Sequence, residues 1–272
     1  MKKMLAFLLI VSLLALMFSF ALAEEKEPET YTSGVWKYIV LEDGTAEIIR
    51  CGSDENEISV PEELDGRKVT GIGNRAFYGG GFLTSITIPD SVTSIGDYAF
   101  ATCRSLVSFT IPDGVTSIGA GAFASCKSLE SITIPDSVTS IGDGAFYECE
   151  SLAAITIPGS VVSIGDSAFQ SCDILESVTI PDGVTSIGDW TFLFCRCLQS
   201  ITIPDSVTSI GKGAINSCPL LFSLTIPDSV TSIGEEVFDY CPFLTVTVGR
   251  DSYARQYCEE KGKKYTYPDA DE

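Results

Sequence analysis

The sequence predicts a repeat solenoid of the α/β class, rich in short strands, with coils stacked along one axis. Two observations predict it. An Ile-Pro pair recurs every 23 residues without insertion over seven units, and the apolar positions inside each unit keep the same spacing. A fixed period of this length is the usual sign of a solenoid, because one unit cannot bury its own apolar face. The isoleucines of the pairs are Ile88, Ile111, Ile134, Ile157, Ile180, Ile203 and Ile226.

One unit shows how each coil is expected to run. Ile132 and Ile134 alternate with small polar residues, which is the period of a strand with one buried face. Pro135 ends this strand because proline has no N–H to donate to a ladder. Residues 138–141 then form a second, short extended segment. The stretch around Phe146 suits a short helical or 3₁₀ turn that leads to the next unit.

The N-terminal end of the solenoid is expected to be covered by a β-hairpin. Residues 36–41 and 46–50 alternate apolar and polar side chains on either side of an Asp-Gly turn. We assign residues 24–59 to an acidic leader and this cap, with 24–32 disordered. The solenoid then occupies residues 60–248, about eight 23-residue rungs. Its first unit carries five inserted residues at 64–68, which predict a hairpin-like bulge.

Residues 249–272 are expected to close the other end with a strand-helix-strand cap and a tail. A strand at 245–248 precedes a short helix that Asp251-Ser252 can cap, and a strand at 263–267 follows it. Tyr253, Tyr257 and Cys258 fall on one helical face, so we expect all three to close the core.

The repeat pattern I-x-I-P-x-x-V-x-x-I-G-x-x-A-F-x-x-C-x-x-L resembles the BspA-type leucine-rich repeat of bacterial and protist surface and secreted proteins. The resemblance covers roughly residues 60–248. It implies a curved leucine-rich-repeat solenoid with a parallel sheet along one face, and a role in adhesion or binding. Because the motif consists of core positions, it carries over no functional residue.

The first residues are typical of an export signal. Lys2 and Lys3 precede an apolar run over residues 4–20, and Ala21-Leu22-Ala23 forms a small-residue cleavage site. Residues 1–23 are therefore expected to be a cleaved signal peptide, with an uncleaved membrane anchor as the alternative. The mature protein is expected to be secreted or associated with the cell surface, without a membrane anchor.

The net charge and the composition exclude several classes of partner and of catalytic site. The formal net charge is −20 and falls to −22 once Lys2 and Lys3 are removed. Such an acidic surface argues against nucleic acid and anionic lipid, and permits cationic partners or Ca²⁺; it can also serve solubility alone. The chain has no histidine, which excludes Ser-His and Cys-His nucleophilic pairs and the usual histidine-containing zinc sites. We expect no enzyme and no cofactor, although a carboxylate-dependent glycan hydrolase needs only two acids.

Three rows of residues recur at the 23-residue period. The cysteines are expected to form a buried ladder of free thiols, with disulfides or metal as the alternative, because equivalent residues on adjacent rungs point in parallel. The aspartates favour turns, with Ca²⁺ between rungs as the alternative. The Ser-x-Thr pairs are expected on a solvated strand face, where ice or a sugar polymer could bind. The cysteines are Cys103, Cys126, Cys149, Cys172, Cys195, Cys218 and Cys241; the aspartates are Asp90, Asp113, Asp136, Asp182, Asp205 and Asp228.

One region departs from the repeat. Trp190 replaces the glycine or serine that several other units carry at this position, and Leu193 and Phe194 replace small or polar pairs. The next unit carries Leu220 and Phe222 after its cysteine. Large exposed apolar clusters often mark interfaces, so these five residues form a candidate partner-contact patch; local repacking around Ile215 is the alternative.

These features favour a secreted or cell-surface binding or adhesion module that recognises an extracellular protein or glycan through the repeat surface. A structural component of a surface layer or matrix is the alternative. The sequence leaves the identity of the partner and the oligomeric state open.

The signal peptide gives the first prediction. N-terminal sequencing of the exported protein is expected to begin at Glu24, because the Ala-x-Ala site follows the apolar run directly. Exported protein that begins at Met1 would show that the apolar run is retained.

Overall fold

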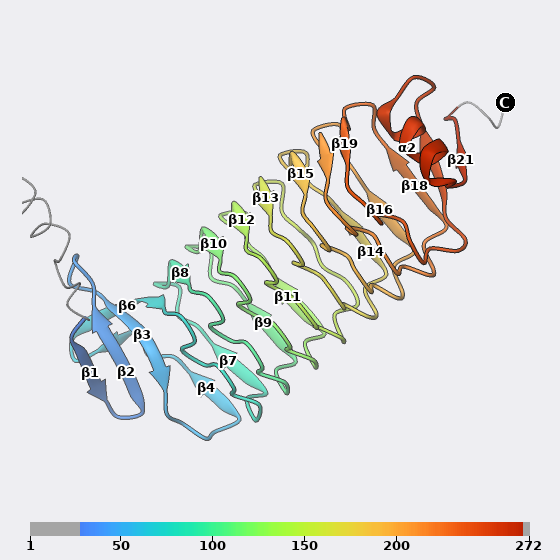
Figure 1. Ribbon diagram of the computed structural model, residues 1–272. Helices are drawn as coiled ribbons and strands as arrows, with labels where there is room; N and C mark the ends of the chain where they lie inside the picture. The colour runs from blue at the N-terminus through green and yellow to red at the C-terminus, as the bar shows by residue number, and fades with distance from the viewer. Residues whose placement is uncertain (1–27, 269–272) are drawn as a thin grey trace, which may run out of the picture.

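The structure, a computed structural model, describes residues 28–268 and is an elongated β-solenoid of about ten turns (Figure 1). The N-terminal strands and the C-terminal helix lie at opposite ends of its long axis. The solenoid class is confirmed, and the count exceeds eight rungs because the caps continue the coil. The expected signal peptide and the acidic tail after Pro268 lie outside the described residues. No helix in the described part is long and apolar enough to cross a membrane.

Nearly every described coil contributes a short strand to one long side of the solenoid; the exception lies at residues 154–156, where Ala154 makes only an isolated bridge to Ser177. The sequence Ser-apolar-Thr forms most of these strands, with the middle side chain buried and the flanking two exposed. Neighbouring strands are parallel and in register, for example Ser131 with Ser108. These strands are β4 (Glu57–Ser59), β7 (Ser85–Thr87), β9 (Ser108–Thr110), β11 (Ser131–Thr133), β14 (Ser177–Thr179), β16 (Ser200–Thr202), β18 (Ser223–Ile226) and β20 (Thr245–Val248).

A second strand in each coil lies beyond the Pro-Asp turn and forms a second set of parallel pairs. Most are only two residues long, and each places an isoleucine inward. The prediction of a second extended segment is confirmed. These strands are β6 (Arg67–Ile72), β8 (Ser94–Ile95), β10 (Ser117–Ile118), β12 (Ser140–Ile141), β13 (Ser163–Ile164), β15 (Ser186–Ile187), β17 (Ser209–Ile210) and β19 (Ser232–Ile233).

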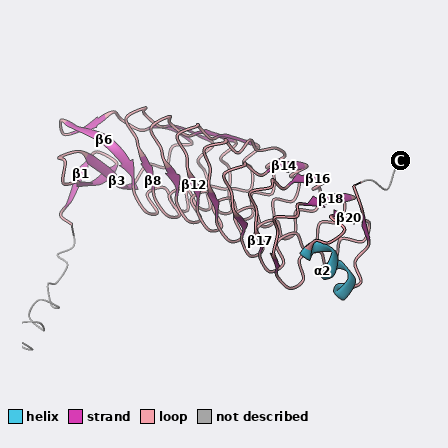
Figure 2. Ribbon diagram, turned by 90° about the horizontal axis from the view of Figure 1, so that it is seen from above, coloured by secondary structure: helices cyan, strands magenta, loops and turns pink. Residues whose placement is uncertain are grey.

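The third side of each coil is a run of turns, where a helical or 3₁₀ segment was expected (Figure 2). Local bonds such as Cys103 N–H to the Phe100 carbonyl (3.2 Å) persist. However, Tyr98 and Thr102 have left-handed backbones (φ 55° and 61°), which interrupt any helix. Their N–H groups donate instead to the next rung, at 2.8 Å and 2.7 Å. The turn side is therefore bonded from rung to rung, as the strand sides are.

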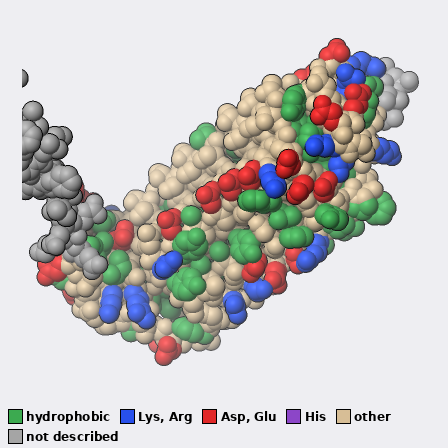
Figure 3. Space-filling view, viewed as in Figure 1, with side chains coloured by type: hydrophobic (Ala, Val, Ile, Leu, Met, Phe, Trp, Pro, Cys, Tyr) green, Lys and Arg blue, Asp and Glu red, His purple; other side chains and the backbone are tan. Residues whose placement is uncertain are grey.

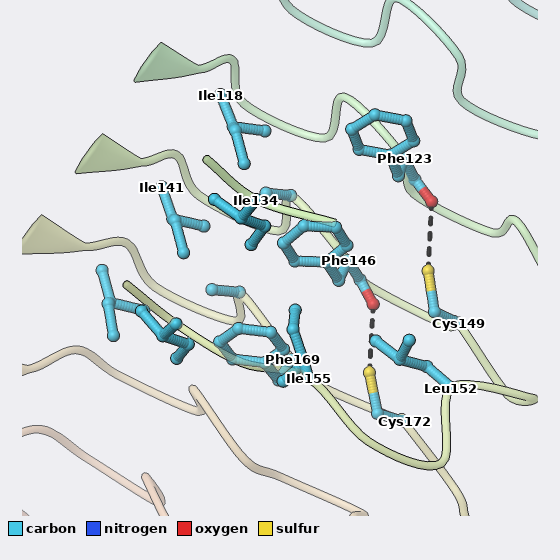
Figure 4. Close-up of a cluster of buried hydrophobic side chains, with 14 of the residues drawn as sticks. Ile118, Phe123, Ile134, Ile141, Phe146, Cys149, Leu152, Ile155, Phe169 and Cys172 are labelled. Atoms are coloured by element: carbon cyan, nitrogen blue, oxygen red, sulfur yellow. Dashed lines mark hydrogen bonds between the residues drawn. The ribbon is translucent and has the colours of Figure 1, made fainter. Parts of the chain in front are cut away.

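The core is a single column of repeated side chains (Figure 4). The phenylalanine of each unit stacks on the next, with ring centroids 5.1 to 5.7 Å apart and nearly parallel planes. Parallel rings at this spacing are offset, the arrangement that aromatic pairs favour. Ile215 ends the stack after Phe192, and the smaller side chain is still fully buried. The stacked residues are Phe77, Phe100, Phe123, Phe146, Phe169 and Phe192.

The cysteine ladder is confirmed as a set of free thiols; all ten cysteines are unpaired. Six of the seven ladder thiols also donate a hydrogen bond to the phenylalanine carbonyl of the preceding rung, as Cys149 does to Phe123 and Cys172 does to Phe146 (3.2 and 3.3 Å; Figure 4). The seventh, Cys241, is only half-buried and donates to the Ile215 carbonyl at 3.1 Å. The sequence did not predict this bond. The thiols therefore link adjacent rungs besides filling space.

The corner after the second strand brings adjacent backbones close together. A Cβ on Gly142 would lie 2.7 Å from the Ala120 nitrogen, which explains why the repeat needs glycine here. The next residue supports the corner through its side chain: Asp143 Oδ1 accepts a bond from the Asp166 N–H at 2.9 Å. Asn74, Asp97, Asp166 and Asp189 act in the same way. This ladder was not singled out from the sequence.

The N-terminal cap contains the expected hairpin of β2 (Trp36–Val40) and β3 (Ala46–Cys51), and β3 pairs in parallel with β6. The leader was expected to be disordered through residue 32, which is wrong for its last residues: β1 (Thr30–Ser33) pairs with β2. The inserted residues form the predicted hairpin, in which β5 (Glu63–Leu64) pairs with β6. Asp65 in its turn accepts bonds from Tyr38 Oη (2.7 Å) and Ser33 Oγ (2.8 Å), which lower the pKa of its carboxyl.

The C-terminal cap is β20, helix α2 (Tyr253–Lys261) and β21 (Tyr265–Thr266), as expected. Ser252 caps α2 through a bond from the Arg255 N–H, and Gly262 ends it in a left-handed conformation. Tyr257 and Cys258 are buried, but Tyr253 is 42% exposed, so its expected place in the core is wrong. Ala254 takes that place, because it stands three and four positions before Tyr257 and Cys258 and so shares their helical face.

Gly142 and Gly159 form a matched pair for testing the corner. Gly142→Ala is expected to lower the free energy of unfolding by about 1–3 kcal/mol, because its Cβ would meet backbone atoms that cannot move alone. Gly159→Ala meets nothing within 4 Å and is expected to be neutral or slightly stabilising. Urea unfolding checks both; equal effects would contradict the close approach at the corner.

The cysteines give a further prediction. Burial raises the pKa of the Cys103 and Cys149 thiols to about 12, and the thiolate is the reactive species. Alkylation of the native protein at pH 8 is therefore expected first at the half-buried Cys51, Cys197 and Cys241. Denatured protein without reductant should titrate most of its ten thiols as free, and three or more disulfides would contradict the ladder.

Cys126→Ala should cost roughly 1 kcal/mol of stability, since the Phe100 carbonyl keeps its bond from the Cys103 N–H. Cys197→Ala is the control, because Cys197 lies off the ladder and should leave stability unchanged. Urea unfolding of the two variants makes the comparison.

Candidate functional site

The aspartate row that follows the prolines lies at exposed turns between the two strand sides. Apart from this row, Figure 3 shows a line of acidic side chains along the long axis of the face drawn. Among residues 28–268, no group of three or more Cys, Asp or Glu side chains is arranged to hold a metal ion. Turn formation by aspartate after proline accounts for the row without a ligand.

The Ser-x-Thr pairs are exposed on the first strand side, as expected, at Ser85/Thr87, Ser108/Thr110, Ser131/Thr133, Ser177/Thr179, Ser200/Thr202 and Ser223/Thr225. A further hydroxyl row, on the second strand side, is partly engaged: Thr139 Oγ1 donates to the Thr116 carbonyl of the preceding rung at 3.1 Å. These uniform rows single out no position along the solenoid.

Three of the five candidate contact residues come together around one depression. Trp190, Leu193 and Phe194 line it with Asn216, Ser217, Glu236 and Tyr240, and it has a volume of about 490 Å³. We call it the Trp190 hollow. It lies on the turn side and spans three rungs, since its residues come from three consecutive units.

Trp190 is held flat by the unit that follows it. A Cβ added to Gly213 would lie 2.8 Å from Trp190 Cδ1, so the indole covers the backbone of Gly213 and leaves 39% of its surface exposed. Tyr98 covers Gly121 in the same way at the equivalent position. The indole is thus partly a packing element, as the alternative interpretation held, yet its outer face remains open. It covers Gly213, whereas the alternative placed it over Ile215.

Leu220 and Phe222 do not line this hollow. Both are exposed, and Phe222 stacks on Phe243 at 5.9 Å, beyond the cysteine that ends the turn side. The five candidates therefore form two groups instead of one patch.

Tyr240, Glu236 and Phe243 were missed from the sequence. The period contained the signal, because Tyr240 stands two units after Phe194 and Glu236 stands two units after Trp190. Tyr240 is 80% exposed, and Phe243 is 62% exposed.

The charged residues around the Trp190 hollow differ in whether they have an ion-pair partner. Arg196 lies outside it, paired with Asp173 and 5.9 Å from the Phe194 ring centroid. Asp239 is paired with Lys263 at 2.6 Å. The Glu236 carboxylate, by contrast, has no hydrogen-bond or ion-pair partner within the described part of the chain. The hollow therefore combines aromatic walls with one unpaired negative charge.

A second hollow, of about 540 Å³, lies at the N-terminal end of the turn side. Arg50, Arg75 and Tyr78 line it, and Gly80 stands where later units carry the ladder cysteine. The Arg75 guanidinium lies near the rings of Tyr78 and Tyr98, at 5.9 and 5.5 Å. Asp54 also lines this hollow, so its charge is mixed.

Comparison with known proteins identifies the repeat. The model of the BspA-type leucine-rich repeat region matches residues 70–192 and 116–245, with six copies. No match was found among functionally curated proteins.

Two solved structures share the fold. The leucine-rich repeat protein TpLRR of T. pallidum is 34% identical, with a TM-score of 0.67 over 71% of this chain and 91% of that one. A leucine-rich repeat protein from Bacteroides ovatus is 27% identical, with a TM-score of 0.64 over 87% and 67%. Repeat, spacing and fold agree, and this chain therefore belongs to the BspA-type leucine-rich repeat family.

Proposed function

We propose that this protein is a secreted or cell-surface binding module that recognises an extracellular partner through the turn side of its solenoid. The family is one of bacterial surface-type proteins, and leucine-rich repeat scaffolds are generally non-enzymatic. A solenoid offers a long, rigid surface on which exposed side chains can be placed at fixed distances.

The observation that carries the proposal is the Trp190 hollow. Elsewhere, the two exposed turn positions that Trp190 and Phe194 occupy mostly hold serine, glycine, threonine or glutamate. At this point they present a tryptophan, a phenylalanine and a tyrosine around a depression. Aromatic side chains supply much of the binding energy in interfaces because they bury a large area with few rotatable bonds.

The backbone conformation at these three aromatic residues is sterically unfavourable for large side chains. Trp190, Phe194 and Tyr240 all have positive φ, at 54°, 63° and 58°. Bulky side chains rarely adopt this conformation, which glycine or asparagine tolerates better. Packing alone does not require them, since Ser167 and Ser171 occupy the same two positions one unit earlier. A contact role accounts for aromatic residues at positions where the fold accepts serine.

The double variant Trp190→Ser with Phe194→Ser tests the proposal. It is expected to lose partners captured by the wild-type protein in a glycan array and a pull-down. Thermal stability should fall only slightly, because serine occupies both backbone positions in the neighbouring unit.

Tyr98→Ser is the matched control, since Tyr98 occupies the repeat position of Trp190 and also covers a glycine. It should keep every partner. A sharp loss of thermal stability in the double variant, with capture and self-association unchanged, would show that the aromatic cluster belongs to the core.

A further inference from the structure

The walls of the Trp190 hollow come from the first and third of three rungs. Trp190 and Phe194 stand on the first, and Glu236 and Tyr240 stand at the same two repeat positions on the third. Rungs follow one another at about 4.8 Å, so the two walls are about 10 Å apart. That separation admits one side chain between the Phe194 and Tyr240 rings.

The floor comes from the middle rung, which contributes Asn216 and Ser217 to the lining. Gly213 lies under the Trp190 indole. Asn216 is 8% exposed; its Nδ2 donates to the Glu236 carbonyl at 3.1 Å, and its Oδ1 accepts from Ser217 Oγ at 2.7 Å. The side-chain amide of Asn216 therefore already bonds to the protein, and a ligand would meet mainly ring faces and the Glu236 carboxylate.

Charge selects the kind of ligand. No lysine or arginine is among the lining residues, and the carboxylate of Glu236 is unpaired in residues 28–268. The chain as a whole carries a net charge of −20, which attracts cations. A cation near aromatic faces is stabilised by the ring quadrupoles, most strongly by tryptophan. Arg196 against Phe194 already provides one such contact on the outer side of the hollow.

We propose that the Trp190 hollow binds the positively charged side chain of a lysine or arginine on a protein partner. This inference rests on the binding role proposed above and adds the ligand class to it. The aromatic residues supply apolar contact and cation–π attraction, and Glu236 supplies the countercharge. A neutral sugar fits less well, because sugar recognition depends on several free hydrogen-bonding groups and this floor has few.

Titration with short peptides tests the ligand class. The probes are Ac-Gly-Gly-Arg-Gly-Gly-NH₂ and the same peptide with citrulline, which keeps the shape of arginine without its charge. Binding is followed by the NMR signal of the Trp190 indole N–H, assigned by its loss in Trp190→Phe and so distinguished from Trp36. The arginine peptide should shift this signal, and the citrulline peptide should bind about two- to fivefold more weakly. Added salt should weaken binding of the arginine peptide, because it screens the attraction between charges.

Glu236→Gln and Glu235→Gln form the matched pair of variants. Both remove one negative charge from adjacent exposed residues, but only Glu236 lines the hollow. Glu236→Gln should weaken binding of the arginine peptide about two- to fivefold, and Glu235→Gln should change the affinity much less. Equal weakening by both variants would overturn the proposal, since the general field of the protein would then account for the attraction.

Three other results would also overturn it: equal binding of the arginine and citrulline peptides, no shift of the Trp190 signal with the arginine peptide, or a shift caused only by a neutral N-acetylglucosamine oligomer. These results bear on the ligand class alone. If the arginine peptide fails but the Trp190→Ser, Phe194→Ser variant loses its captured partner, the binding role stands with a different ligand. If that variant keeps every partner, the binding role of the hollow fails as well.

Discussion

The structure depends on backbone hydrogen bonding between rungs on all three sides of the coil. Two sides are parallel strand ladders, and the third is the series in which residues such as Tyr98 and Phe100 donate to the next rung. An inserted residue within a rung would break the register on three sides at once. This constraint explains why seven units keep 23 residues, and why the one insertion, at residues 64–68, extends outward as a hairpin in the first unit.

Strict register places each side chain directly beside its copies in the next and preceding units. Inside, this gives the phenylalanine stack and the hydrogen bonds from the ladder thiols to carbonyls of the preceding rung. Outside, it gives uniform rows of serine, threonine and aspartate. A uniform row offers the same chemistry at every rung and therefore cannot position one ligand. Specificity in such a molecule has to arise where a unit departs from the repeat, as it does at Trp190.

Much of the fold could be predicted from the sequence, because a fixed 23-residue period occurs only when equivalent residues stack in successive coils. The strand positions, the Asp-Gly hairpins and the capped helix α2 all follow from local patterns. The turn side did not follow: left-handed residues such as Thr102 and Glu148 carry side chains that give no sign of positive φ. The aspartate ladder after the corner glycine was also missed, since an acidic residue in a turn has many possible partners and only the stacking selects one.

The candidate site was half predictable for the same reason. Trp190, Leu193 and Phe194 stood out as departures within one unit, and the structure brings them together. Leu220 and Phe222 stood out equally, but they lie past the cysteine on the next side of the coil. Tyr240 does not stand out beside its neighbours along the chain, because its relation to Phe194 spans two periods. In a solenoid, distance along the surface is counted in whole units, so departures at the same repeat position meet.

The pairing of each large turn residue with a following glycine limits where such a site can form. Tyr98 lies over Gly121 and Trp190 over Gly213, and any Cβ at either glycine would collide with the ring. An aromatic residue at this position therefore requires a small residue one unit later, and the wall across the hollow can come only from the unit after that. Three units are the smallest set that can build a walled depression on this side. The width of the Trp190 hollow is thus fixed by the rung spacing, and its chemistry is set by the residues at the two turn positions of the first and third units.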